Sequence, residues 1–153
     1  MFSGSAFLLY VIIFFIGAIF GSFFNLCIYR IPRKISIVFP RSHCLSCGHA
    51  LGALDLIPIV SFVMLRGKCR YCKAKIPIGC LLTEVFTGTS YLILYCLYGC
   101  TNNLLLYLIL LSILIVITPI DIITYTIPDG IVLCGALFAL LLNLLSFGIG
   151  FRR

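Results

Sequence analysis

Two cysteine pairs in one polar segment decide the fold: Cys44-Leu45-Ser46-Cys47 and Cys69-Arg70-Tyr71-Cys72. The turn inside each pair directs both sulfurs the same way, so each pair can place two thiolates on one metal ion. The pairs are separated by 21 residues, slightly more than is typical of two-pair zinc sites. A closed site of four thiolates is structural, because it leaves no coordination position open for a substrate. We therefore predict one structural zinc ion, held by Cys44, Cys47, Cys69 and Cys72.

The residues around the cysteine pairs leave other interpretations open. His43 and His49 flank the first pair and are alternative ligands, although a histidine on a polar loop is more often solvated. The negative charge of a zinc tetrathiolate would be offset by nearby bases, namely Arg66, Lys68, Arg70, Lys73 and Lys75. A redox-active dithiol is a further alternative, but no thioredoxin-like βαβ pattern surrounds the pairs.

The composition is that of an integral membrane protein. The chain has 153 residues, of which 63% are hydrophobic and 10% charged, with a mean hydropathy of +1.25. A soluble domain of this length cannot bury so much apolar surface. The net charge is +7, and nine of the eleven Lys and Arg residues lie between Arg30 and Lys75. Because the bases are confined to one loop, we predict anionic membrane lipids as partners and no nucleic acid. Loops rich in Lys and Arg stay on the cytoplasmic side, which places this loop there.

Four apolar runs are long enough to cross a bilayer as helices: Ala6–Ile28, Ile78–Tyr98, Leu104–Ile120 and Ile131–Phe147. The first is too long for the core of a cleaved signal and is expected to remain as an anchor. The predicted fold class is therefore all-α, a polytopic membrane helical bundle with a small zinc-knuckle loop domain. The expected divisions are 1–29, the first transmembrane helix; 30–77, a cytoplasmic basic four-cysteine domain; and 78–153, transmembrane helices two to four.

Some loop and span-end residues have two interpretations each. The apolar stretch Leu54–Leu65 is too short to span, so it lies on the membrane or packs against the knuckles. Glu84, inside the second span, either extends to the interface or contacts the cytoplasmic loop. For Asn25, a polar residue near the end of the first span, the default interpretation is a role in packing helices together.

Two aspartates flank the third and fourth spans. Asp121 is expected at the cytoplasmic end of the third span, and Asp129 opens the fourth. Both are either interfacial residues, with Asp129 as a helix cap, or markers of chemistry. In a continuous helix they would lie about 12 Å apart along the axis, too far to share a proton as an aspartic-protease pair does.

Five motifs between residues 17 and 130 occur in a specific order and spacing. They are Gly21-Ser22-Phe23-Phe24-Asn25 leading to Tyr29-Arg30-Ile31-Pro32; Cys44-x-x-Cys47-Gly48-His49 with Asp55-Leu56-Ile57-Pro58; Leu65-Arg66-Gly67-Lys68-Cys69-Arg70-x-Cys72; Glu84; and Asp121 through Ile127-Pro128-Asp129. This series resembles the bifunctional type IV prepilin peptidases. The resemblance favours the functional interpretation of Asp121.

That family cleaves the short basic leader from prepilins and pseudopilins at the cytoplasmic face, then N-methylates the new terminus with S-adenosylmethionine. The resemblance implies that Asp121 is one of two catalytic aspartates, with Glu84 and Asp129 as supporting residues and the cysteine domain serving methyl transfer and substrate recognition. It implies a bacterial inner-membrane protein of a type IV pilus, type II secretion or competence system. The residues that bind the methyl donor are not identified.

The chain departs from the family pattern at its end. The family's second aspartate lies in a Gly-x-Gly-Asp motif, whereas Gly148-Ile149-Gly150-Phe151 has Phe151 in the place of the acid. It also comes too soon after Asp121 to be the equivalent element. The chain resembles the front half of the enzyme, so we expect either a truncated or frameshifted product or a chain that needs a missing C-terminal fragment, and leave open whether it is an enzyme alone. The alternative is a non-catalytic, membrane-anchored zinc module that binds pilus or secretion-machine components.

Overall fold

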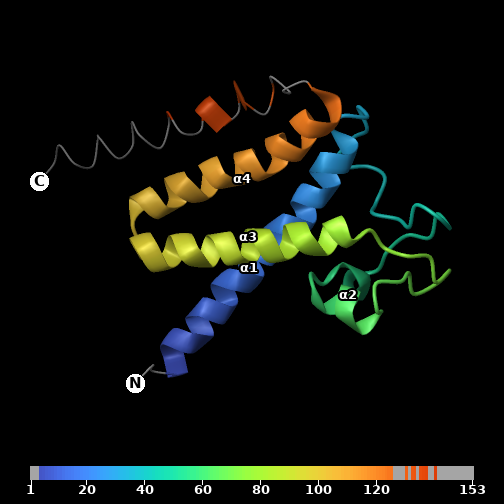
Figure 1. Cartoon of the computed structure of the whole chain (residues 1–153), viewed down its shortest axis with the longest axis horizontal. Coiled ribbons are helices and arrows are strands. Elements are labelled where there is room, and N and C mark those ends of the chain that lie inside the picture. Colours follow the sequence, from blue (N-terminus) through green and yellow to red (C-terminus); the bar gives the residue numbers. More distant parts are fainter. Residues whose placement is uncertain (1–3, 126–129, 131, 134, 138–139, 141–153) are drawn as a thin grey trace, which may run out of the picture. The chain divides into compact units, whose positions relative to one another are not determined.

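All named secondary-structure elements are helical in the part that the computed structural model describes, residues 4–125, 130, 132–133, 135–137 and 140, and the loop between the first two long helices is mostly irregular. The elements are α1 (Gly4–Arg30), the short 3₁₀ turn η1 (Ala53–Leu56), α2 (Val60–Met64), α3 (Ile78–Tyr98) and α4 (Asn102–Thr124). Figure 1 labels the α-helices. These described residues contain isolated bridges but no β-strand. The predicted all-α class is confirmed, while most of the fourth predicted span, Ile131–Phe147, lies outside the described residues.

The three long helices are the candidate membrane spans. Ala6–Arg30, Ile78–Tyr98 and Asn103–Thr124 are each long and apolar enough to cross a bilayer. This confirms the first three predicted spans. The third runs beyond its predicted end at Ile120 and includes Asp121.

The chain divides into two compact units, Met1–Leu92 and Ile93–Arg153. In the second unit, the side chain of Thr101 caps the start of α4 by accepting a hydrogen bond from the N–H of Leu104. The left-handed conformation of Tyr125, with a φ of 52°, ends that helix. The rings of Tyr98 and Tyr107 pack with their centroids 4.5 Å apart, joining the end of α3 to the start of α4.

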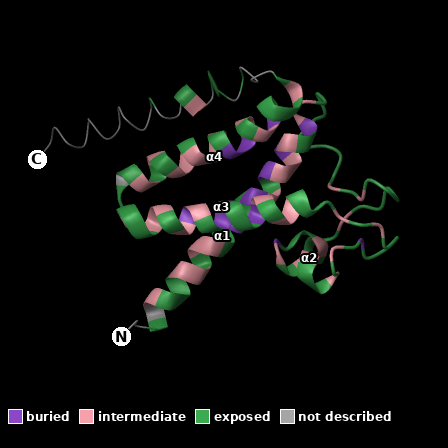
Figure 2. Cartoon of the chain, in the orientation of Figure 1, coloured by how far each residue is buried: buried purple, intermediate pink, exposed green. Residues whose placement is uncertain are grey.

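In the first unit, α1 and α3 approach closely through glycines. A Cβ atom placed on Gly17 would lie 2.8 Å from the Cα of Gly88, and one on Gly21 would lie 2.8 Å from the Cα of Glu84. No side chain fits at such distances, so these glycines set the separation of the two helices. Figure 2 shows buried residues of both helices where they cross.

Polar contacts fix the chain where α1 and α3 meet the loop between them. The side-chain amide of Asn25 donates to the carbonyl of Cys80 at 2.9 Å, which confirms its helix-packing role. The guanidinium of Arg30 is buried and donates to the carbonyls of Ser36 and Pro40, at 2.8 and 2.7 Å. The last residue of α1 therefore folds the start of the loop back onto the helix end.

Candidate metal centre

The first cysteine pair lies in a tight knuckle. The N–H of Cys44 donates to the carbonyl of His49 at 2.9 Å, and the N–H of Gly48 donates to the carbonyl of Cys44 at 2.8 Å. Gly48 has a φ of 71°, a conformation that costs glycine little. The turn closes on an antiparallel bridge between His43 and Ala50. This backbone geometry aims both sulfurs of the pair toward one point.

The second cysteine pair repeats the same knuckle. The N–H of Cys69 donates to the carbonyl of Ala74 at 2.8 Å, and the N–H of Lys73 donates to the carbonyl of Cys69 at 3.1 Å. Lys73 takes the left-handed position, with a φ of 61°, and Lys68 bridges Lys75. The two knuckles share this backbone geometry although a glycine in the first, Gly48, corresponds to a lysine in the second.

The four knuckle cysteines bring their sulfurs together. All four Sγ atoms lie within 4.8 Å of one another, and those of Cys44 and Cys72 are 3.8 Å apart. In a tetrahedral zinc tetrathiolate with bonds of about 2.3 Å, sulfurs are separated by about 3.8 Å. The four thiols are free rather than joined in disulfides. This donor set could hold a metal ion and fits a tetrahedral one.

The two histidines near the first knuckle lie outside this group of ligands. The ring of His49 stacks on Tyr71 with centroids 3.6 Å apart, and Nδ1 of His43 lies 3.1 Å from the carbonyl of Arg41. The His49–Tyr71 contact joins residues of the two knuckles. Both rings therefore have structural partners in the loop.

The surroundings of the sulfurs give the thiols different proton affinities. Hydrogen bonds from the backbone N–H groups of Cys47 and Ser46 lower the pKa of Cys44 to about 6, against an opposing effect of burial. At Cys72 the N–H of Ala74 favours the thiolate, but burial and the neighbouring sulfurs outweigh it and raise the pKa to about 11. The thiolate of Cys44 thus forms readily in the metal-free cluster, whereas that of Cys72 needs a cation to replace its proton.

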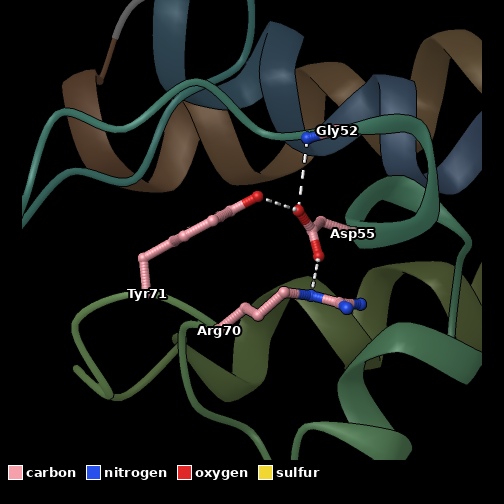
Figure 3. Close-up of polar contacts among 4 residues, drawn as sticks. All are labelled: Gly52, Asp55, Arg70 and Tyr71. Carbon is pink, nitrogen blue, oxygen red and sulfur yellow. Dashed lines mark hydrogen bonds and ion pairs between the residues drawn. The ribbon is translucent and has the colours of Figure 1, made fainter.

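Asp55 holds the second knuckle from the segment between the pairs. Figure 3 shows its carboxylate accepting from the Arg70 Nε at 2.7 Å, the Tyr71 hydroxyl at 3.3 Å and the backbone N–H of Gly52 at 3.2 Å. Arg70 and Tyr71 are the two residues between the second pair of cysteines. The Asp55 side chain is only 6% exposed, whereas that of Arg70 is 48% exposed.

Three donors keep the Asp55 carboxylate charged. Burial opposes ionisation, but the hydrogen bond from Gly52 and the charge and hydrogen bond of Arg70 outweigh it, so the pKa of Asp55 lies below its usual range. Asp55 belongs to one of the sequence motifs, but the motif alone assigns it no partner. Its signal was its position as the one acid in the basic loop, where an ion pair with a base of the second knuckle could have been expected.

Glu84 joins the loop to α3. The residue is only 8% exposed, and its carboxylate accepts a hydrogen bond from the backbone N–H of Ile59 at 2.7 Å. Ile59 has a φ of 63° and a ψ of −52°, a rare γ-turn in which the N–H of Val60 donates to the carbonyl of Pro58. A β-branched residue is strained there, so its surroundings must hold it in place. Of the two sequence-based alternatives for Glu84, the structure shows contact with the loop.

The two aspartates of the predicted catalytic motif lie outside the first unit. Asp121 is exposed in the last turn of α4, and its backbone carbonyl accepts the N–H of Tyr125 at 2.7 Å. An acid is electrostatically disfavoured at a helix C-terminus, so helix stability does not account for this residue. Asp129 lies outside the described residues.

Known proteins resemble the chain over the four-cysteine loop and the helices that flank it. The family model of the bacterial peptidase A24 N-terminal domain matches residues 15–98. A prepilin leader peptidase/N-methyltransferase of Myxococcus xanthus is 36% identical over 83% of this chain and 38% of its own length. One from Klebsiella pneumoniae is 37% identical over 84% of this chain and 59% of its own length. One from Bacillus subtilis is 34% identical over 80% and 49%. No solved structure matches.

Proposed function

Because the chain belongs to the bacterial peptidase A24 family, whose N-terminal domain it contains, we propose that it acts in the processing of prepilin leader peptides. The chain spans about 38–59% of the length of the relatives cited above, so the activity of the whole protein is part of the proposal. The observation that supports it best is that the matched region forms a compact four-thiol loop attached by Glu84 to a membrane helix.

The proposed chemistry is hydrolysis of a peptide bond at the membrane surface. Asp121 would be one of two carboxyl groups: one takes a proton from the attacking water, while the other protonates the departing amine. Glu84 and Asp129 are proposed as supporting residues. The end of α4 suits this role, because an exposed carboxylate at the end of a span can meet a peptide from the aqueous side.

The proposed metal is a structural zinc ion on the four loop cysteines, where it would hold the two knuckles together. The names of the relatives include N-methyltransferase, so we propose S-adenosylmethionine as the methyl donor, without assigning residues to it. The proposed location is the bacterial inner membrane, with the cysteine loop and Asp121 on the cytoplasmic side. The concentration of bases in residues 30–75 supports that orientation.

The peptidase proposal is tested by supplying the C-terminal part that longer relatives have. The chain is produced in a bacterial membrane together with such a fragment and a prepilin, and leader removal and N-methylation are followed by mass spectrometry. We expect cleavage that Asp121→Asn reduces by about 10²–10⁴-fold. Asp129→Asn is the matched variant and is expected to cause a smaller loss. Cleavage at the wild-type rate by Asp121→Asn would contradict the mechanism.

The second candidate is a non-catalytic zinc module that binds a component of the pilus or secretion machine. It is favoured by the fact that a single loop supplies all four potential metal ligands, without any residue of α4. Partner binding that survives Asp121→Ala and is lost in Cys44→Ser would support this candidate over the peptidase.

A further inference from the structure

Helix α2 has an apolar face that the described chain leaves uncovered. Val60, Val63 and Met64 lie at helical spacing on one side, and Val63 and Met64 are 64% and 77% exposed. The opposite side faces the loop, since the ring of Phe62 approaches Gly67 so closely that a Cβ there would lie 3.0 Å from it. The apolar stretch therefore divides into an inward side and an outward side.

Glu84 fixes the position along α3 beside which α2 begins. Ile59 directly precedes α2, and its N–H donates to Glu84, six residues into the membrane-spanning helix α3. Six residues correspond to about 9 Å along a helix axis. The start of α2 thus lies beside the span rather than beyond its end. A backbone N–H at that depth needs a partner from the protein, because lipid offers none, and Glu84 supplies it.

Bases follow directly after the apolar face. Arg66 and Lys68 are exposed and lie just beyond the end of α2. Near an anionic membrane surface each base contributes roughly 1 kcal/mol, and a long side chain can extend from an apolar layer to the headgroups. An apolar face bordered by bases has the charge and polarity of a segment that lies in the lipid interface.

We propose that α2 inserts Val60, Val63 and Met64 among the lipid acyl chains beside α3, with the Glu84–Ile59 hydrogen bond holding it at that depth. The loop is then attached to the membrane at a third place, besides the ends of α1 and α3. The partner is the lipid bilayer itself, which distinguishes this surface from one that would bind a protein.

The chain contains no tryptophan, so a single introduced Trp reports its own surroundings. The full chain carrying Met64→Trp is reconstituted into phosphatidylcholine and phosphatidylglycerol vesicles, with and without bromine on the acyl chains. We expect blue-shifted emission and quenching several-fold stronger than for Leu45→Trp. Leu45 is similarly exposed but lies in the first knuckle. Val63→Trp serves as a second reporter if Met64→Trp does not fold.

Each outcome decides the proposal. Red-shifted emission without quenching would show that α2 lies in water, and blue-shifted emission without quenching would show that protein covers it; either result overturns the proposal. In the Met64→Trp background, Glu84→Ala should reduce quenching, whereas Glu84→Gln, which keeps an acceptor oxygen, should preserve most of it. Equal quenching in both would overturn the role of Glu84.

Discussion

The four-cysteine loop and the end of α4 are built in opposite ways. In the loop, all four potential metal ligands come from one segment, and the carboxylate of Asp55 meets three donors from that same segment. Asp121 is an exposed side chain in a helix turn whose dipole disfavours it. A site built from one segment can be tested on this chain alone, whereas a pair of catalytic carboxyls needs a second group from elsewhere.

Among the substitutions considered, removing a sulfur from the loop should change the zinc content and stability of the protein most. Cys44→Ser deprives the proposed zinc ion of one of four ligands, and structural zinc sites contribute roughly 10–16 kcal/mol of binding free energy. We expect the zinc content to fall from about one ion per chain to near zero and the loop to become sensitive to protease. Elemental analysis and limited proteolysis of the purified protein measure both effects.

The matched control for that experiment is Cys96→Ser. Cys96 is an exposed cysteine of α3 outside the cluster, so its loss should leave the zinc content unchanged. If Cys44→Ser retained zinc and resisted protease as the wild type does, the loop would not be a metal-stabilised domain. The loop would then not be a self-contained site, and it would no longer differ in this respect from the end of α4.

A smaller effect is expected from Asp55→Asn, which keeps the loop ligands but removes the charge that faces Arg70. Because Arg70 is half exposed, we expect the free energy of unfolding of the loop to fall by only about 1 kcal/mol at pH 7. This loss would be seen as faster amide hydrogen exchange in the second knuckle. The folded-state pKa of Asp55 is lowered, so its stabilisation is complete above about pH 4 and is lost as the pH falls through that lowered pKa.

The difference between Asp55→Asn and the wild type should therefore shrink at acidic pH. Tyr71→Phe is the control, since it removes one hydroxyl but leaves the Asp55–Arg70 pair intact. It should keep the wild-type pH dependence. A difference between Asp55→Asn and the wild type that stayed constant below pH 4 would mean that Asp55 does not act through its charge.

The sequence predicted those features that local composition and spacing determine. The apolar runs gave the first three spans, and the bounds of α3 agree with the prediction. The spacing of the cysteine pairs indicated one shared cluster, which the structure forms. The length of α4 was underestimated because Asp121 was expected to end the span, whereas an acid can continue a helix that a left-handed residue ends later.

The remaining features depend on contacts that no local pattern encodes. Glu84 meets the backbone of Ile59, and a backbone donor leaves no signature in side-chain chemistry. The strained turn at Ile59 occurs at a β-branched residue, where propensity argues against it. Asp55 pairs with a residue of the second knuckle only because the two knuckles fold toward one centre.

X-ray absorption at the zinc edge of the purified wild-type chain shows whether the four loop sulfurs share one metal ion. A single zinc ion bonded to four sulfurs at about 2.3 Å is the result expected if the loop is a tetrathiolate domain on the membrane helices. A coordination shell with nitrogen from His43 or His49, or a metal-free protein whose loop cysteines are disulfide-bonded, would contradict it.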